Sequence, residues 1–327
     1  MISSTWAVLL AGGSGTRFWP RSTPERPKQC LVIDGERSLI QQTVDRLDGL
    51  VPTDRVLVVT GREMFEAIRQ QLPELSDDQF IVEPSARNTG PAIALAALEV
   101  EARGGQCMVV LPTDHRIADH EGFRGCIRRG IELAAGGVLV LLAQSPTRAE
   151  PGFGYIELND AGRVTRFTEK PDAGSAAALI DRGALWNGGM FVWTIDAIRG
   201  AYQKHLPGLW GLVATDWQAV PPISVDRGIL ERAENAIAIR CDVGWSDLGS
   251  WRSAGIPADR ADQIVSIDAP GNVIDAPGRR VVVLGISDLV IVDTGEILMV
   301  IPKDQAHRVD ELRSALNEKK ADHTPFG

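Results

Sequence analysis

The stretch LAGGSGTRFWP, residues 10–20, decides how this chain begins to fold. It follows a short apolar run at residues 7–10 and holds three glycines within four positions. Glycine lets successive backbone N–H groups point into one concavity, which suits phosphate oxygens, and Arg17 adds a planar, permanently charged guanidinium. The sequence therefore predicts a strand that is followed directly by an anion-binding loop.

Three prolines between residues 20 and 27 set the shape of the segment after the glycines. Each would break a helix interior at a cost of about 3 kcal/mol, so we expect a long irregular loop over residues 11–37. A dinucleotide-binding crossover is excluded, because its helix begins at once after the glycines. A Walker A loop is excluded too, because its Gly-Lys-Ser/Thr ending is missing. A glycine turn that only reverses the chain would not explain why Arg17 and Lys28 accompany it.

Outward from this loop, short β-branched runs alternate with amphipathic stretches. The strand-like runs lie at residues 7–10, 56–60, 79–82, 107–111 and 138–142, and helical patterns lie between them at 39–47, 63–72, 92–102 and 122–135. Strands that are apolar on both faces and separated by helices predict an α/β fold, Rossmann-like, with a mostly parallel central sheet flanked by helices. Such open sheets bind ligands beyond the carboxyl ends of their strands.

The second half of the chain has a different pattern of strand-like and helical runs. Residues 154–158 and 164–168 flank an Asn-Asp-Ala-Gly turn and predict a β-hairpin. A helix at 175–182, a strand at 189–193 and helices at 195–205 and 226–233 should follow. After residue 258, five strand-sized runs are separated by turns, and a helical pattern at 305–316 comes last. We expect two domains, residues 1–257 and a small β-rich unit of residues 258–327.

Composition narrows the classes of partner. The chain of 327 residues is 44% hydrophobic and 24% charged, which is typical of folded globular proteins. Its 34 Lys and Arg residues face 43 Asp and Glu residues, and this net charge of −9 argues against nucleic acid or an anionic membrane as a partner. No apolar stretch approaches the 18 residues of a membrane span, so a cytoplasmic location is expected.

Asp114 is the first candidate metal ligand. It closely follows the apolar run at residues 107–111, so it should project from the carboxyl edge of the sheet. Magnesium prefers hard oxygen ligands and typically takes one or two carboxylates together with substrate phosphates. The alternative is that Asp114 caps a helix.

The motifs of this chain resemble those of the sugar-1-phosphate nucleotidyltransferases, and within that family those of the mannose-1-phosphate guanylyltransferases. The family begins with a G-G-x-G-T-R loop and a later P-K, matched here at residues 12–17 and 27–28. Further matching motifs are FWP at 18–20, EP at 83–84, NTGPA at 88–92, LPTDH at 111–115, GFGYI at 152–156, EKP at 169–171, WNGGMF at 186–191, SVD at 224–226 and WSDLG at 245–249. The resemblance covers about residues 6–255, in the family's order.

The resemblance implies a reaction and a C-terminal domain. GMP would pass from GTP to α-D-mannose 1-phosphate, giving GDP-mannose and pyrophosphate by Mg²⁺-assisted in-line displacement without a covalent intermediate. Such chemistry brings several negative charges together, so catalysis depends mainly on positioning the substrates and neutralising their charge. A sugar phosphate is already about a dianion near pH 7. The implied C-terminal domain resembles a left-handed β-helix. It could be a surface that joins two copies into a homodimer, or only a lid.

The resemblance also assigns roles to residues. Arg17 and Lys28 would be catalytic, with Arg17 on the leaving pyrophosphate and Lys28 on the α-phosphate and sugar phosphate. The nucleotide would be bound by Leu10, Ala11, Gly12, Gly13, Ser14, Gly15, Thr16, Arg17, Asn88 and Thr89. The sugar phosphate would be bound by Gly154, Glu169, Lys170, Asn187 and Asp226. Asp247 would join Asp114 as the second Mg²⁺ ligand.

Alternatives to these roles remain open from the sequence. Asp247, Asn88 and Asp226 could each cap a helix, and Asn187 could be a turn residue. Glu169 and Lys170 could form a surface ion pair. Glucose 1-phosphate with UTP or dTTP would be a rival substrate pair, and a non-catalytic nucleotide sensor would be a rival of a different class.

Overall fold

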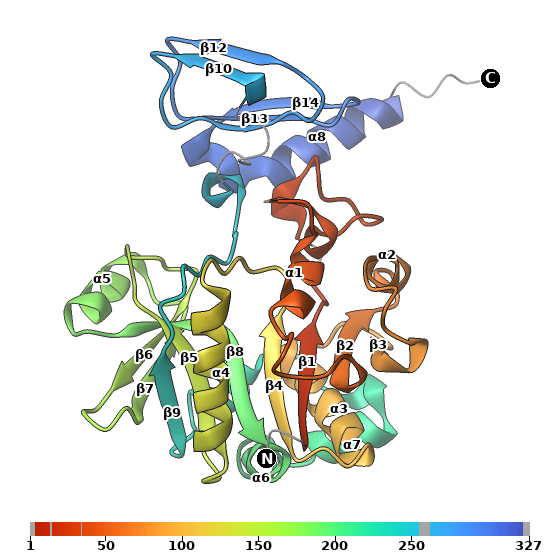
Figure 1. The fold of residues 1–327 in the computed structure, drawn as a ribbon, viewed down its shortest axis with the longest axis vertical. Coiled ribbons are helices and arrows are strands. Elements are labelled where there is room, and N and C mark those ends of the chain that lie inside the picture. The colour runs from red at the N-terminus through yellow and green to blue at the C-terminus, as the bar shows by residue number, and fades with distance from the viewer. Residues whose placement is uncertain (1–3, 14, 34, 255–261, 323–327) are drawn as a thin grey trace.

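The computed structural model describes residues 4–13, 15–33, 35–254 and 262–322 (Figure 1). A nine-stranded sheet runs through the larger part of the chain, in the order β3-β2-β1-β4-β8-β5-β9 along its main path. These strands are β1 (Thr5–Leu10), β2 (Val56–Gly61), β3 (Phe80–Glu83), β4 (Cys107–Pro112), β5 (Leu139–Gln144), β8 (Leu185–Thr194) and β9 (Ala236–Arg240). Only β8 runs antiparallel to its neighbours on this path, so the expected mostly parallel sheet is confirmed.

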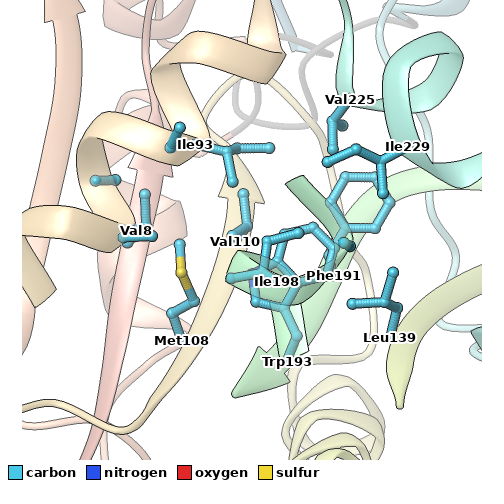
Figure 2. Close-up of a cluster of buried hydrophobic side chains, with 14 of the residues drawn as sticks. Val8, Ile93, Met108, Val110, Leu139, Phe191, Trp193, Ile198, Val225 and Ile229 are labelled. Carbon is cyan, nitrogen blue, oxygen red and sulfur yellow. The ribbon is translucent and has the colours of Figure 1, made fainter. Parts of the chain in front are cut away.

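Two cores cover the two faces of this sheet. Alternate side chains of a strand point to opposite faces, and Val8 and Met108 pack in one core whereas Leu9 and Val109 pack in the other. Figure 2 shows the first core, where Val8 and Met108 meet Ile93 and Trp193. Burial on both faces explains why these strands read as continuous apolar runs.

Helices form the outer layers. One face is covered by α3 (Thr89–Ala102), α6 (Ile195–His205) and α7 (Leu209–Thr215), and the other by α1 (Leu39–Asp45), α2 (Phe65–Gln71) and α4 (His120–Ala134). Strand β9 and helix α7 were not predicted from the sequence. The helix expected at residues 226–233 is instead a short π-helical turn, η7 (Asp226–Leu230).

The predicted hairpin is confirmed and extends the sheet sideways. It consists of β6 (Gly154–Leu158) and β7 (Val164–Glu169), and β6 also pairs with β8 through Tyr155 opposite Trp186. The Asn159 side chain accepts hydrogen bonds from the backbone N–H groups of Ala161 and Arg163, which closes the turn. Helix α5 (Ala173–Asp181) follows the hairpin.

The C-terminal part of the chain forms stacked β coils. Its strands are β10 (Ile264–Ile267), β11 (Val273–Asp275), β12 (Val281–Leu284), β13 (Leu289–Asp293) and β14 (Leu298–Pro302), followed by η10 (Lys303–Arg308) and α8 (Val309–Asp322). Ile264 pairs in parallel with Val281, and Val273 pairs with Val290 at the same sequence offset. Parallel strands that return at a constant offset form coils, as expected of a β-helix-like domain.

This β domain packs on the long loop that follows β1 (Figure 1). Phe18 and Leu31 of the loop share one buried cluster with Val273, Val290 and Val309. The loop contains two 3₁₀ turns, η2 (Thr16–Phe18) and η3 (Lys28–Cys30), and is otherwise irregular, as its prolines predict. The expected domain boundary after residue 257 lies outside the described residues.

No helix in the described part of the chain is long and apolar enough to cross a membrane. The cytoplasmic location expected from the sequence stays a prediction.

Candidate active site

A cavity of about 420 Å³ opens at the carboxyl ends of the central strands. Its lining includes Leu10, Gly12 and Gly13 from the glycine loop, Glu83, Asn88 and Thr89 near the start of α3, Asp114 and His115 after β4, and Asn187, Gly189 and Asp226 from β8 and η7. Leu10 lies opposite Pro112 in the parallel register of β1 and β4, so the segments after both strands emerge at one edge. This is the location that an open α/β sheet predicts for its ligand.

Lys28 connects the two candidate metal-binding segments. Its Nζ donates to Asp114 Oδ2 at 2.8 Å and to the backbone carbonyl oxygen of Asp247 at 2.7 Å. The residue is 5% exposed, and Nζ lies 5.5 Å from the centre of the Phe18 ring. A buried ammonium needs such partners, so Lys28 fixes the two aspartates' segments beside the glycine loop.

The backbone brings Asp114 and Asp247 together despite their distance in sequence. Arg116 and Ser246 form an isolated antiparallel bridge, with N–H to O distances of 2.9 and 3.0 Å in the two directions. Ala118 N–H also donates to the carbonyl of Val243 at 2.9 Å. The chain that leaves β9 therefore runs back along the chain that leaves β4.

The helix-capping alternative is wrong for both aspartates. The helix after β4, α4, is capped by Asp119, whose side chain accepts from Gly122 N–H. The short turn after Asp247 begins behind Ser250 instead. Neither carboxylate is therefore used as a helix cap. Asp114 lines the cavity and pairs with Lys28, and Asp247 lies on the adjoining segment.

The protonation of this cluster follows from its charges. Burial works to raise the pKa of Asp114, but the Lys28 ammonium and His115 outweigh it, so the pKa lies below its usual value. Burial lowers the pKa of His115, against the pull of Asp114. Trp245 Nε1–H donates to His115 Nδ1 at 3.1 Å, so a neutral His115 carries its proton on Nε2, 3.8 Å from Asp114 Oδ1.

The donor set suits a hard cation that binds together with a substrate. Among the described residues, no three or more His, Cys, Asp or Glu side chains are grouped to hold a metal ion by themselves. Magnesium commonly uses one or two carboxylates and completes its shell with phosphate oxygens and water. Asp114 and Asp247, carried on paired segments, fit that requirement.

The glycine loop is packed closely against Lys28. Gly15 has φ of 59°, and a Cβ at this position would overlap Lys28 Cβ, so only glycine fits. Gly12 and Gly13 are exposed at the cavity, and Ala11 N–H donates to the Val59 carbonyl at 2.8 Å. Ser14 lies outside the described residues.

Several predicted residues are not part of the cavity lining in the described part of the chain: Ala11, Gly15, Thr16 and Arg17 of the loop, and also Lys28 and Asp247. Arg17 is exposed on η2, and Thr16 Oγ1 donates to Asp310 Oδ2 of α8 at 3.4 Å. The structure thus places Arg17 on the surface, outside the cavity lining.

The start of α3 forms another wall. Asn88 Oδ1 accepts from Thr89 N–H at 2.8 Å, so the capping interpretation of Asn88 is confirmed. Thr89 Oγ1 accepts from Val225 N–H at 3.0 Å, which ties this helix to η7. Both residues still line the cavity.

The five predicted sugar-phosphate residues lie near one another, beside β8. Asn187 Nδ2 donates to Asp226 Oδ1 at 2.9 Å. A Cβ on Gly154 would lie 2.7 Å from Glu169 Oε2 and 3.2 Å from Asn187 Cβ. Burial, and then the negative charge of Glu169, raise the pKa of Asp226 to about 6.

The alternatives for this group have mixed outcomes. Lys170 Nζ does form an ion pair with Glu169 Oε1 at 3.0 Å, and its side chain is mostly exposed. Glu169 itself is nearly buried, so the pair is not a fully solvated surface contact. Asn187 lies within β8, next to a shift in its register with β5, so the turn-residue alternative is wrong; its Oδ1 accepts from Gly189 N–H.

Glu83 is the residue that sequence reasoning missed. It ends β3, lines the cavity and is 6% exposed, yet its Oε1 has no hydrogen-bond partner among the residues that the structure describes. Burial raises the pKa of Glu83 to about 7. A buried carboxylate without a partner costs free energy, so a ligand with N–H donors is its natural counterpart. The signal in the sequence was a lone acidic residue at the end of an apolar strand.

Comparison with known proteins agrees with this architecture. Residues 6–255 match the Nucleotidyl transferase family, and residues 262–316 match the MannoseP isomerase/GMP-like beta-helix domain. The mannose-1-phosphate guanylyltransferase of Escherichia coli is 31% identical, over 98% of this chain and 74% of its own length. Mannose-1-phosphate guanylyltransferase ManC of Salmonella typhimurium is 32% identical, over 97% and 73%.

Solved structures agree as well. A crystal structure described as mannose-1-phosphate geranyltransferase from Thermus thermophilus superposes with a TM-score of 0.86 at 31% identity, over 96% of this chain and 99% of that one. It shares both parts of the fold, because its match extends over nearly the whole chain. The protein therefore belongs to the nucleotidyl transferase family.

Proposed function

We propose that this protein transfers GMP from GTP to α-D-mannose 1-phosphate and releases pyrophosphate, giving GDP-mannose. The observation that carries the proposal is the Lys28 cluster. One buried cation holds Asp114 and the Asp247 segment at the mouth of a cavity that joins the glycine loop to Asn187 and Asp226. The names of the relatives at 31% and 32% identity supply the substrates.

The proposed chemistry rests on neutralising charge. The α-phosphate of GTP and the sugar phosphate repel each other, and a positive group between them lowers that repulsion in the transition state. Lys28 lies beside the glycine loop and can approach both phosphates, while Arg17 can meet the leaving pyrophosphate outside the cavity. The sugar phosphate dianion attacks directly, so no protein base is needed.

Nucleotidyl transferases generally work with a divalent metal ion, and we propose Mg²⁺ held by Asp114 and Asp247. The ion would bind phosphate oxygens and withdraw their charge during displacement. The Arg116 and Ser246 bridge supports this proposal, because it pairs the backbone segments that carry the two aspartates.

For the sugar, we propose that the carboxylates and the amide beside β8 bind hydroxyl groups. Asn187 can donate and accept, and Asp226 and Glu169 accept. Their mutual contacts fix the orientation of each side chain before the sugar arrives. Lys170, mostly exposed at the rim, would meet the sugar's phosphate.

For the base, we propose that Glu83 accepts hydrogen bonds from guanine. The Watson–Crick edge of guanine presents N1–H and N2–H₂ donors side by side, and an ionised carboxylate offers two acceptor oxygens. Adenine and uracil each present a mixture of donors and acceptors, so they match a carboxylate less well. The unpartnered Oε1 of Glu83 in the cavity supports this role.

The reaction is tested with a substrate panel. Purified protein is incubated with Mg²⁺, one of GTP, ATP, UTP or dTTP, and either mannose 1-phosphate or glucose 1-phosphate. Pyrophosphate and sugar nucleotide are both measured. We expect GTP with mannose 1-phosphate to give the highest kcat/KM. Absence of pyrophosphate with this pair, or a clear preference for another, would contradict the proposal.

We further propose that residues 258–327 form a separate domain that joins two copies of the chain. Val265 and Ile267 of β10 lie opposite Val282 and Leu284 of β12, and all four side chains are at least half exposed. A contiguous apolar face of this kind is uncommon on monomers. Sedimentation velocity should show that the wild type is a dimer and that V282E/L284E is a monomer. The control A214E, at an exposed position of α7, should remain a dimer. A monomeric wild type would refute the pairing.

A further inference from the structure

We propose that Lys28 couples nucleotide binding to metal binding, because its ammonium and the divalent cation compete for the carboxylate of Asp114. The inference rests on the metal site proposed above. Its basis is the contact pattern of Nζ, which lies 2.8 Å from Asp114 Oδ2 and 2.7 Å from the Asp247 carbonyl. A cation bound between the same two segments would meet the ammonium there.

The competition follows from charge and space. Two unit positive charges about 4 Å apart repel by several kcal/mol at the effective dielectric of a partly buried site. Asp114 is about one third exposed, whereas the Lys28 side chain is 6% exposed, so solvent reaches the carboxylate but screens the ammonium little. A metal ion approaching Asp114 from solvent must therefore displace the ammonium or bind weakly.

The structure also limits where the ammonium can go. The Lys28 stem is held, because its Cβ packs directly beneath Gly15 and the side chain lies along Phe18. Only the outer part of the side chain is free to turn. The nearest site that could accept a displaced ammonium is a phosphate bound on the glycine loop, which the same Gly15 places next to Lys28.

Nucleotide binding then prepares the metal site. A phosphate on the loop draws Lys28 Nζ from Asp114, and the freed carboxylate binds the cation. Coupling of this kind is reciprocal, so the metal should also favour the nucleotide-bound position of Lys28. The protein alone should bind a divalent ion weakly, which agrees with the lack of a third protein carboxylate among the described residues.

The test measures metal binding rather than turnover. Mn²⁺ is titrated into nucleotide-free protein, and free Mn²⁺ is followed by electron paramagnetic resonance. Lys28→Met keeps the length of the side chain and removes its charge, and we expect it to bind Mn²⁺ about tenfold more tightly than the wild type. Lys204→Met removes the charge of an exposed lysine on α6, outside the proposed site, and is the matched control, with an expected change below about twofold at 0.15 M salt.

The second arm adds saturating GTP analogue with a methylene bridge between the α- and β-phosphorus, which cannot be cleaved there. The advantage of Lys28→Met should disappear, because the phosphate has already drawn the wild-type ammonium away. Lys28→Gln serves as a second neutral variant, and circular dichroism checks that each variant is folded.

Two outcomes separate the inference from the proposed metal site. If Asp114→Asn binds Mn²⁺ as tightly as the wild type, the proposed metal site is wrong and the inference falls with it. If Mn²⁺ binding depends on Asp114 but folded Lys28→Met and Lys28→Gln bind no more tightly than the wild type, the competition alone is overturned.

Discussion

At the scale of the residue, burial of Glu83 in the cavity lowers the stability of the folded protein. Burial raises its pKa to about 7 from an unfolded value near 4.5, so the folded protein favours the neutral acid. Glu83 therefore costs the folded protein no stability below pH 4.5, where the acid is neutral in both states. The free energy of unfolding then falls as pH rises through 7, because the buried carboxylate must ionise. The shift corresponds to a cost on the order of 3 kcal/mol at pH 8.

Glu83→Gln should remove this cost. We expect the nucleotide-free variant to melt at a higher temperature than the wild type at pH 8 and at nearly the same temperature at pH 4.5. Thermal unfolding at the two pH values, with exposed Glu66→Gln as the control, checks the sign. Equal melting temperatures at pH 8 would mean that Glu83 is not held in a costly ionised form.

The same substitution tests how the base is recognised. An amide replaces one acceptor with a donor, so Glu83→Gln should lower kcat/KM for GTP by about ten- to a hundredfold, mainly through KM. The loss should be smaller for ITP, whose base lacks the N2 amino group. In the wild type, KM for GTP should rise as pH falls below about 7, because protonation removes an acceptor. An unchanged GTP to ITP ratio would exclude Glu83 from the base contact.

At the scale of the element, the paired segments after β4 and β9 place their two aspartates in different contacts with Lys28. Lys28 uses the carboxylate of Asp114 but only the backbone carbonyl of Asp247. Both Asp114→Asn and Asp247→Asn should therefore lose most turnover, yet only Asp114→Asn weakens the partner of a buried cation. Denaturant unfolding should show a loss of about 1–2 kcal/mol for Asp114→Asn and little for Asp247→Asn. A reversed order would place Lys28 elsewhere.

The glycine loop contains its own matched pair of positions. A Cβ at Gly15 would overlap Lys28 and sit at positive φ, whereas a Cβ at Gly13 would meet nothing within 4 Å. Gly15→Ala should therefore lower the melting temperature, and Gly13→Ala should leave it nearly unchanged. Thermal unfolding of the two variants side by side is the measurement. Equal stability would contradict the close packing of the loop on Lys28.

At the scale of the whole molecule, Trp251, which precedes the β domain, and the β domain itself both pack on the loop that carries Arg17 and Lys28. The Trp251 ring packs against Phe18 with ring centres 4.9 Å apart and ring planes tilted by 46°, and its Nε1–H donates to the Trp19 carbonyl at 2.9 Å. Arg21 of the loop pairs with Asp275 of β11 at 3.2 Å. The domain thus holds the outer side of the loop, while Lys28 holds the inner side.

Trp251→Ala should therefore affect both stability and binding. Its buried ring predicts a loss of about 3–5 kcal/mol in the free energy of unfolding and an increased KM for GTP. Trp251→Phe keeps a ring but loses the hydrogen bond, so its effects should be smaller in both measurements. If KM for GTP stays at the wild-type value in folded Trp251→Ala, Trp251 does not position the loop.

The sequence by itself determined the irregular loop, because three prolines forbid a helix there, and it determined the sheet, because apolar runs alternated with helical patterns. It also placed Asp114 at the carboxyl edge. It did not predict β9, a short strand whose pairing with β5 depends on distant contacts. Only the tertiary structure decided that the chain after β9 returns to Arg116, which unites Asp247 with Asp114. Only it decided that Glu83 is buried without a partner, since burial depends on segments far away in the chain.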